Sequence, residues 1–333
     1  MLLSVVIPYF NSNAWIGQML DSLLDQGIDS DEYEIIVIDD DSTEEPVVLK
    51  EYVAKYPNIR YYKQQKQGQA EARNYGLSLS RGEWLYFCDS DDYLQRQVLS
   101  GIIDAAEKHN LELIFGTIYH VSPSFVPTNP KRNFESLSEI KTGIVYFAEP
   151  NEFFSFGLWS FLIRRSVLIE HNLRFEKLHV AEDCLFFVDM MPCISRTAHI
   201  DVDLYYYVQH DSSVMHRRKR EDCSSYMADL YRFIVRLADE IKNGIRLPVY
   251  HKMMSNLLGV YSYSLLHNVF RYCPVSETID YISRLENLDA YPIRIRLNSP
   301  LHRAILKLVN IKPLWLLFCR LYHLFPIRLR LRF

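Results

Sequence analysis

Three aspartates follow an apolar run in residues 82–94, Gly-Glu-Trp-Leu-Tyr-Phe-Cys-Asp-Ser-Asp-Asp-Tyr-Leu. Asp89, Asp91 and Asp92 stand where a buried strand would end, and open α/β sheets bind ligands at that end. Carboxylates this close repel one another unless a cation lies between them. Mg²⁺ or Mn²⁺ prefers oxygen ligands and can bridge to nucleotide phosphates. The cluster predicts a divalent-cation site, or, alternatively, Asp91 or Asp92 caps a helix that begins near Tyr93.

Three further segments carry polar side chains with two interpretations each. Asp39-Asp40-Asp41-Ser42 follows another apolar run and either accepts from a base N–H or ribose hydroxyl, or forms a turn. Arg73 lies in a predicted helix after Gly68, and it either reaches a diphosphate or faces solvent. Glu182-Asp183 precedes an apolar helical segment and supplies either a catalytic carboxylate or a cap.

Alternating strands and helices must position these side chains. The runs 3–8 and 34–39 are β-branched and do not alternate, which is typical of parallel strands buried on both faces. Between them, residues 13–26 have helical periodicity, with Asn13 as a cap and Gly27 as the end. The pattern continues through helices near 46–56, 69–79 and 93–109 and strands near 60–62, 84–88 and 111–116. Residues 1–116 are therefore predicted to form a Rossmann-like, mostly parallel sheet flanked by helices.

The second half of the same domain is assigned to residues 117–224. Several prolines predict an irregular, substrate-holding excursion from 117 to 150, and order returns at Trp159. Residues 161–165 and a helix near 182–191 rebuild a core, and residues 198–208 are strand-like and rich in tyrosine. Residues 225–333 are predicted to be a helical extension that ends in a basic amphipathic tail.

Composition limits the class of protein. The chain has 333 residues, of which 49% are hydrophobic and 23% charged, as in soluble globular proteins. Six scattered cysteines without a CxxC pair indicate reduced thiols in the cytoplasm. The first residues lack a basic region, so we expect no signal peptide. Without GxGxxG or P-loop glycines, dinucleotide and P-loop folds are excluded.

The charge is unevenly distributed along the chain. No acidic residue follows Asp289, whereas nine of the 37 Lys and Arg residues do, which leaves 28 basic against 41 acidic residues before the tail. Residues 301–326 mix these cations with leucines, Trp315 and Phe318, and their apolar run is too short to span a bilayer. We expect an interfacial helix on an anionic membrane surface, or a helix packed on protein.

Taken in chain order, the motifs resemble the family 2 glycosyltransferases of GT-A fold, over residues 1 to about 220. The segments that carry the resemblance are Asn11, Asp39-Asp40, Arg73-Asn74, Asp89-Ser90-Asp91, Trp159 and Glu182-Asp183. The resemblance implies transfer, with inversion, from a nucleotide-diphosphate sugar, most often a UDP-sugar, to a glycan or polyprenyl-linked acceptor. Such enzymes build O-antigen, capsule or exopolysaccharide, so we expect a cytoplasmic protein at the inner face of the plasma membrane that binds no nucleic acid.

The resemblance also implies residue roles. Pro8, Tyr9 and Asn11 would line the nucleoside, Asp39 and Asp40 the base, and Arg73 the diphosphate, while Asp89 and Ser90 would face the ribose or the outer shell of a Mg²⁺ or Mn²⁺ ion. Asp91 would be the direct metal ligand and Asp183 the catalytic base. His210 and Arg217 match a closing loop that approaches the metal or the diphosphate, or else they belong to a solvated basic loop. Trp159 either stacks on a sugar or packs in the core.

Three other classes of protein were weighed. A nucleotidyltransferase shares the fold and the metal, but its glycine- and arginine-rich first turn is absent from residues 8–13. A phosphatase with a DxD nucleophile carries that motif after its first strand. A non-catalytic binding module at a membrane surface has no need of Asp89, Asp91 and Asp183 together, and hydrolysis of a UDP-sugar would separate it from an enzyme.

Overall fold

The structure is a computed structural model that describes residues 1–148, 157–178, 180–210, 223–244, 247–295 and 299–324. The chain divides into two compact units, Met1–Arg217 and Arg218–Phe333. The second unit begins close to the predicted start of the helical extension. Each unit is described here by itself.

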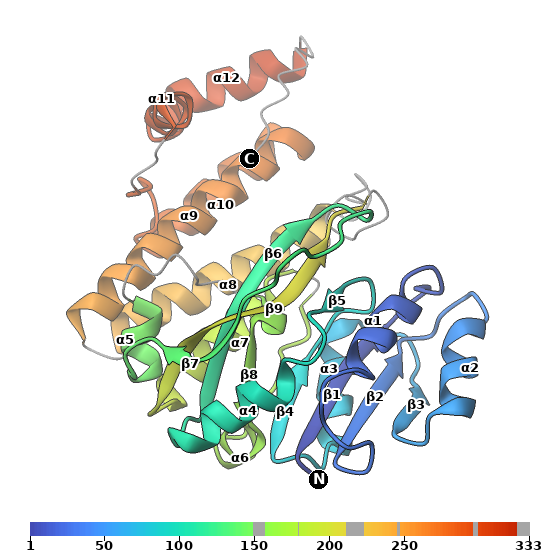
Figure 1. The fold of residues 1–333 in the computed structure, drawn as a ribbon. Helices are drawn as coiled ribbons and strands as arrows, with labels where there is room; N and C mark the ends of the chain where they lie inside the picture. The colour runs from blue at the N-terminus through green and yellow to red at the C-terminus, as the bar shows by residue number, and fades with distance from the viewer. Residues whose placement is uncertain (149–156, 179, 211–222, 245–246, 296–298, 325–333) are drawn as a thin grey trace. The chain divides into compact units, whose positions relative to one another are not determined.

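A mixed nine-stranded sheet forms the centre of the first unit, in the order β3-β2-β1-β4-β8-β6-β9-β5, with β7 paired to β9 (Figure 1). The strands are β1 (Leu3–Tyr9), β2 (Tyr33–Asp39), β3 (Ile59–Lys63), β4 (Trp84–Phe87), β5 (Tyr93–Leu94), β6 (Leu113–Val121), β7 (Arg132–Leu137), β8 (Phe161–Arg164) and β9 (Thr197–Val208). Pairing is parallel from β3 to β4, antiparallel on both sides of β8, and parallel again between β6 and β9. The parallel, Rossmann-like half predicted for residues 1–116 is thus extended by a mixed half.

Helices cover both faces of the parallel half. They are α1 (Ile16–Leu23), α2 (Val47–Lys55), α3 (Gln69–Leu79) and α4 (Leu99–Lys108), followed later by α5 (Gly143–Ala148), α6 (Arg165–Glu170) and α7 (Glu182–Met190). Alternate residues of β1 and β2 pack on α1 and α4, and the intervening ones face α3. Gly76 of α3 lies so close to β1 that an added Cβ would stand 2.3 Å from a methyl of Val6. The absence of a side chain at Gly76 lets α3 pack directly on the sheet.

The second unit is helical in its described part. Its helices are α8 (Cys223–Asn243), α9 (Pro248–Tyr272), α10 (Val275–Asn287), α11 (Pro300–Val309) and α12 (Lys312–Leu324). The single helix predicted for 301–326 is instead two, α11 and α12, separated by Asn310 and Ile311. The side-chain amide of Asn310 pairs with both backbone groups of Ile293 at 2.8 Å. Trp315 is not an exposed anchor: it is buried against Phe270, with ring centroids 4.9 Å apart. No helix among the described residues is long and apolar enough to cross a membrane.

Three local predictions in the first unit were wrong. Residues 93 and 94 form strand β5, paired with β9, and the helix predicted from Tyr93 begins only at Leu99. Asn13 does not cap α1, because its amide donates to the Glu45 carbonyl at 2.7 Å and accepts from the Tyr9 hydroxyl at 3.1 Å. The region from 117 to 150 is only partly irregular, since it contains the end of β6, β7 and α5.

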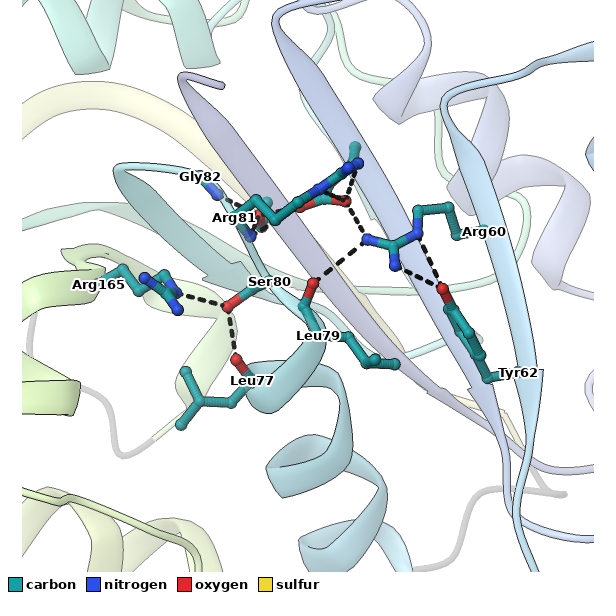
Figure 2. A network of polar contacts seen from close by, with 10 residues as sticks. Arg60, Tyr62, Leu77, Leu79, Ser80, Arg81, Gly82 and Arg165 are labelled. Carbon is teal, nitrogen blue, oxygen red and sulfur yellow. Dashed lines mark hydrogen bonds and ion pairs between the residues drawn. The ribbon is translucent and has the colours of Figure 1, made fainter.

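A buried carboxylate, Glu34, ties the strands together at the amino end of β2, and Figure 2 shows two of its partners, Arg60 and Arg81. Glu34 is 1% exposed and accepts hydrogen bonds from Arg60, from Ser4 at 2.8 Å, and from the backbone and guanidinium of Arg81 at 2.8 and 2.9 Å. Burial alone would raise the pKa of Glu34, but the hydrogen bonds from Arg81, Ser4 and Arg60 together outweigh it and lower the pKa. The network joins β1, β2, β3 and the connection from α3 to β4 through one charge.

We expect Glu34→Gln to lower the free energy of unfolding by about 2 kcal/mol at neutral pH, because hydrogen bonds to a charged group are lost. A carboxyl whose pKa is lowered by folding stabilises the folded state when ionised. The difference in free energy of unfolding between wild type and variant should therefore be largest above the ordinary carboxyl pKa. It should shrink as the pH falls below that value. Urea denaturation across pH measures it, with Glu51→Gln at an exposed carboxylate as the control. A difference that does not change with pH would contradict the assigned role.

Candidate functional site

The predicted site residues gather at the carboxyl edge of three adjacent strands. Asn11 follows β1, Asp39 ends β2, and Asp89 follows β4. The Ser90 hydroxyl lies 2.8 Å from that of Ser12, which joins the loop after β4 to the turn after β1. The parallel register thus brings residues from three motifs to one edge, as expected for a ligand site in an α/β sheet.

Asn11 organises the turn after β1. It has a left-handed backbone with φ of 50°, and its side-chain oxygen accepts from the amides of Thr43 and Glu44 at 3.0 and 3.1 Å. The backbone amide of Asn11 donates to the Ser42 hydroxyl at 3.0 Å. Pro8 and Tyr9 precede this turn in β1, and burial, followed by the nearby Asp39, raises the pKa of Tyr9 to about 12. The turns after β1 and β2 therefore form one connected surface.

Asp39 and Asp40 are already engaged by chain donors. Asp39 accepts from the Ser42 amide and from the Tyr61 hydroxyl, both at 2.8 Å. Asp40 accepts from the amides of Gln67 and Gly68 at 2.7 and 2.9 Å, and so holds the loop that leads into α3. The contacts of Asp40 with this loop were not predicted. Each carboxylate retains lone pairs, since two oxygens accept about four hydrogen bonds.

The cluster after β4 separates into two kinds of aspartate. Asp92 is 2% exposed and accepts from the Tyr205 hydroxyl at 2.8 Å and the Val208 amide at 2.7 Å, so the prediction that it caps a helix was wrong. Burial, then Asp89 and Asp91, raises the pKa of Asp92 well above its usual range. Asp89 and Asp91 keep 28% and 34% of their side chains exposed. These two carboxylates are the ones that face solvent.

His210 approaches the cluster from the end of β9. Its Nε2 lies 3.0 Å from an Asp91 oxygen, and its ring stacks on Trp15 at 4.4 Å between centroids. Burial and then Asp89 raise the pKa of Asp91, while His210 lowers it. Among the described residues, no three His, Cys, Asp or Glu side chains are arranged to hold a metal ion. The carboxylates of Asp91 and Asp89 nevertheless suit Mg²⁺ or Mn²⁺, which commonly takes only one or two carboxylates and completes its shell with phosphates and water.

Arg73 is buried between the two acidic segments and does not face solvent. Its guanidinium donates to Glu182 at 3.0 Å and to Asp89 at 2.9 Å, and only 4% of the residue is exposed. Gln69, one turn earlier in α3, also donates to Glu182. Arg73, which was predicted to bind a diphosphate, is thus already paired with two carboxylates of this chain.

Asp183 differs from its neighbour Glu182. Glu182 is buried and paired with Arg73, whereas Asp183 is partly exposed at the start of α7 and accepts from the Cys184 amide at 2.7 Å. Burial, and then the charge of Glu182, raises the pKa of Asp183 to about 6, while Arg73 and the Cys184 amide act in the lowering direction. Of the two carboxylates, Asp183 is placed and poised to exchange a proton near neutral pH.

Trp159 and Tyr205 support the acidic loop from beneath. Trp159 is 9% exposed and stacks on Tyr205, with centroids 5.1 Å apart and planes 2° apart. The Tyr205 hydroxyl accepts from the Asp89 amide at 3.1 Å, besides donating to Asp92. This places Trp159 in the core. Arg217 lies outside the described residues.

Sequence reasoning missed several residues that shape this edge, namely Trp15, Tyr61, Gln69 and Tyr205. A tyrosine-rich strand was visible at 205–207, but its partners lie more than a hundred residues away along the chain. No local pattern indicates such a pairing.

The chain matches a known protein family and several curated proteins. The family model described as Glycosyl transferase family 2 matches residues 4–171. The chain is 30% identical over 209 residues to poly(ribitol-phosphate) beta-N-acetylglucosaminyltransferase TarP of Staphylococcus aureus, covering 62% of each protein. It is 28% identical over 221 residues to poly(ribitol-phosphate) beta-glucosyltransferase of Bacillus spizizenii, covering 65% of this chain and 33% of that one. The matches span less than two thirds of the length of these curated relatives.

Solved structures show the same fold. Residues 1–349 of S. aureus TarS, in complex with UDP, align with a TM-score of 0.67 at 22% identity, over 99% of this chain and 93% of that one. The mannosyltransferase PcManGT of Pyrobaculum calidifontis, in complex with GDP-Man and Mn²⁺, aligns with a TM-score of 0.54 at 14% identity, over 97% and 87%. The predicted fold class, a GT-A Rossmann-like α/β sheet flanked by helices with a helical C-terminal extension, is confirmed, and the sheet is mixed.

Proposed function

The chain belongs to glycosyl transferase family 2, and from that membership we propose that it transfers a sugar from a UDP-sugar to a hydroxyl of a cell-surface glycan. One observation carries the proposal. The solvent-facing pair Asp89 and Asp91 and the partly exposed Asp183 belong to acidic segments that Arg73 joins at 2.9 and 3.0 Å. A cation-binding pair and a separate base are the two parts that such a transfer requires.

The donor half of the site is assigned to the carboxyl edge of β1, β2 and β4. Pro8, Tyr9 and Asn11 would contact the nucleoside, with Asp39 accepting from the base. The UDP type is supported by TarS, whose structures contain UDP or UDP-GlcNAc. Ser90 lies beside the same loop and Asp40 orders the segment behind it.

A divalent cation fits beside the donor diphosphate, held by Asp91 and assisted by Asp89 and His210. When bound, such an ion stabilises the charge that grows on the nucleoside diphosphate as the glycosidic bond breaks. Oxygen donors and one imidazole are ligands that Mg²⁺ or Mn²⁺ accepts. The chain's own residues orient this site: Tyr205 holds the Asp89 amide, and Trp15 packs against His210.

Asp183 is assigned as the general base. Transfer with inversion passes through an oxocarbenium-like transition state, in which the acceptor oxygen attacks the anomeric carbon and must lose its proton. An ionised carboxylate within hydrogen-bond reach accepts that proton. Glu182 is less suited, because its carboxylate is buried against Arg73.

We place the acceptor at an anionic membrane surface, as a glycan or polyprenyl-linked glycan of cell-surface polymer synthesis. The two curated relatives described above are named as poly(ribitol-phosphate) glycosyltransferases, which supports a glycan acceptor of this kind. In the second unit, large aliphatic side chains in the last two helices and at the position between them are about half exposed: Leu301 (55%), Ile311 (48%), Leu314 (47%), Leu317 (53%) and Leu321 (47%). Arg303, Lys307 and Arg320 are exposed on the same helices. Apolar side chains with cations and no acidic residue after Asp289 suit the interface of an anionic bilayer.

We expect Asp183→Asn to lower the rate of sugar transfer by about 100-fold to 10,000-fold, the usual contribution of a general base, while UDP affinity stays within about twofold. Nucleotide release from UDP-Glc, UDP-Gal, UDP-GlcNAc and UDP-GalNAc with a cell-wall polymer acceptor measures the rate, and calorimetry measures affinity. Asp189→Asn, in the same helix, is the matched control. Because the base must be ionised, kcat/KM of wild type should fall as the pH drops through about 6. Full activity of Asp183→Asn would remove Asp183 from the mechanism.

Removal of divalent cations should abolish transfer, and added Mn²⁺ or Mg²⁺ should restore it. The reason is that the diphosphate leaving group would otherwise depart without charge compensation. Excess EDTA followed by titration with each ion provides the measurement, and Asp91→Asn should raise the Mn²⁺ concentration needed for half-maximal rate. Transfer that persists in excess EDTA would contradict metal dependence.

The membrane assignment predicts that replacing Leu314, Leu317 and Leu321 together by Ser lowers binding to phosphatidylglycerol vesicles at least tenfold. These residues share one face of α12. Each substitution removes apolar side-chain area that binding to the membrane would bury. Sedimentation with anionic and with neutral vesicles gives the measurement, and Ile279→Ser, at an exposed position of α10, is the control. Equal sedimentation of the triple variant and wild type would refute the assignment.

A further inference from the structure

Asn74 in α3 forms two hydrogen bonds with the chain segment that leads to Asp183. Its side-chain amide donates to the Phe175 carbonyl at 2.8 Å, and its side-chain oxygen accepts from the Phe175 amide at 2.9 Å. Both backbone groups of one residue are thus paired with a single side chain 101 positions away. This two-point contact fixes the position and the direction of the segment.

Arg73, the preceding residue, holds the other end of the same segment. One nitrogen of its guanidinium donates to Glu182 at 3.0 Å and the other to Asp89 at 2.9 Å. The group also lies over the Phe175 ring, 5.7 Å from its centroid. A guanidinium that is this buried is stable only when carboxylates compensate it, so removing either partner leaves an uncompensated charge.

The segment held in this way carries backbone strain. Ala181, directly before Glu182, has a left-handed conformation with φ of 63°. That conformation is unfavourable for a residue with a Cβ. Strain of this kind persists only where the surroundings determine it, and here α3 supplies the contacts on both sides of Ala181.

We propose that Arg73 and Asn74 are positioning residues that lock the segment carrying Asp183 to the loop carrying Asp89 and Asp91. The inference rests on the proposed function in that Asp183 is the base. One helical turn of α3 then sets the geometry between the site of proton removal and the cation-binding carboxylates. In this arrangement Arg73 acts on the base segment and is not a diphosphate ligand.

The charge of Arg73 adds a second effect. The groups that bear on Asp183 are Glu182, which raises its pKa, and Arg73 and the Cys184 amide, which lower it. Loss of the Arg73 charge should therefore leave Asp183 protonated to a higher pH. A lysine would keep the charge but cannot bridge two carboxylates with a planar fork.

Three variants test the proposal: Arg73→Met, Arg73→Lys and Asn74→Ala. We expect each to lower kcat by about 100-fold, the effect of a displaced catalytic group, with the Kd for UDP within about threefold of wild type. Arg73→Met should also shift the acid limb of kcat/KM upward by roughly one pH unit, whereas Arg73→Lys should shift it little. Arg60→Met, which removes an arginine from the remote Glu34 network, is the matched control and should leave the pH profile unchanged.

A loss of UDP affinity equal to the loss of kcat/KM would overturn the proposal and make Arg73 a diphosphate ligand. An unshifted acid limb in Arg73→Met would overturn the charge effect. Hydrogen exchange gives a readout that does not need activity: the Phe175 amide should exchange at least tenfold faster in Asn74→Ala, and unchanged exchange would overturn the role of Asn74. If wild type turns over no sugar nucleotide, the proposed function fails, while the exchange result still decides whether α3 holds the segment.

Discussion

The structure depends on how closely packed carboxylates are compensated at one edge of the sheet. Unit charges about 4 Å apart repel by several kcal/mol near a protein surface, so each needs its own partner. The first unit supplies a different partner for nearly every one: backbone amides for Asp40, a tyrosine hydroxyl for Asp92, a shared guanidinium for Asp89 and Glu182, and an imidazole for Asp91. Asp183 accepts from the amide of the residue that follows it, Cys184, and the charge of Arg73 also acts on it. Unlike Asp40 and Asp92, which are buried, Asp183 is partly exposed.

Compensation also explains why distant segments of the first unit meet. Tyr205 reaches from β9 to Asp92 and to the Asp89 amide, and Trp159 packs beneath it. The mixed half of the sheet is thereby connected to the parallel half through the acidic loop. Arg73 makes a second connection between α3 and the start of α7. The elements that carry the proposed donor site and the proposed base are held together by charges and hydroxyls, in addition to the apolar core.

The local periodicity of the sequence was sufficient for the parallel half of the fold, the range of α3 and the start of α7, because burial of β1 and β2 on both faces leaves a continuous apolar run. Local periodicity was not sufficient where a partner far along the chain determines a residue's role or the end of a helix. The role of Asp92 depends on Tyr205, and the break between α11 and α12 depends on the pairing of Asn310 with Ile293. The acidic edge was likewise predicted as a group, whereas the engagement of Arg73 by two carboxylates was not. The order of motifs indicates which residues assemble, but not which of them neutralise one another.

The close approach of α3 to β1 at Gly76 has a consequence for the acidic edge. With 2.3 Å between the place of a Cβ and Val6, a side chain at this position would push α3 away from β1 or displace Val6. Arg73 and Asn74 lie one turn earlier in the same helix, so their contacts with Asp89, Glu182 and Phe175 would shift with it. A single hydrogen atom at position 76, which contacts none of these residues, therefore sets how closely the guanidinium and the amide approach their partners.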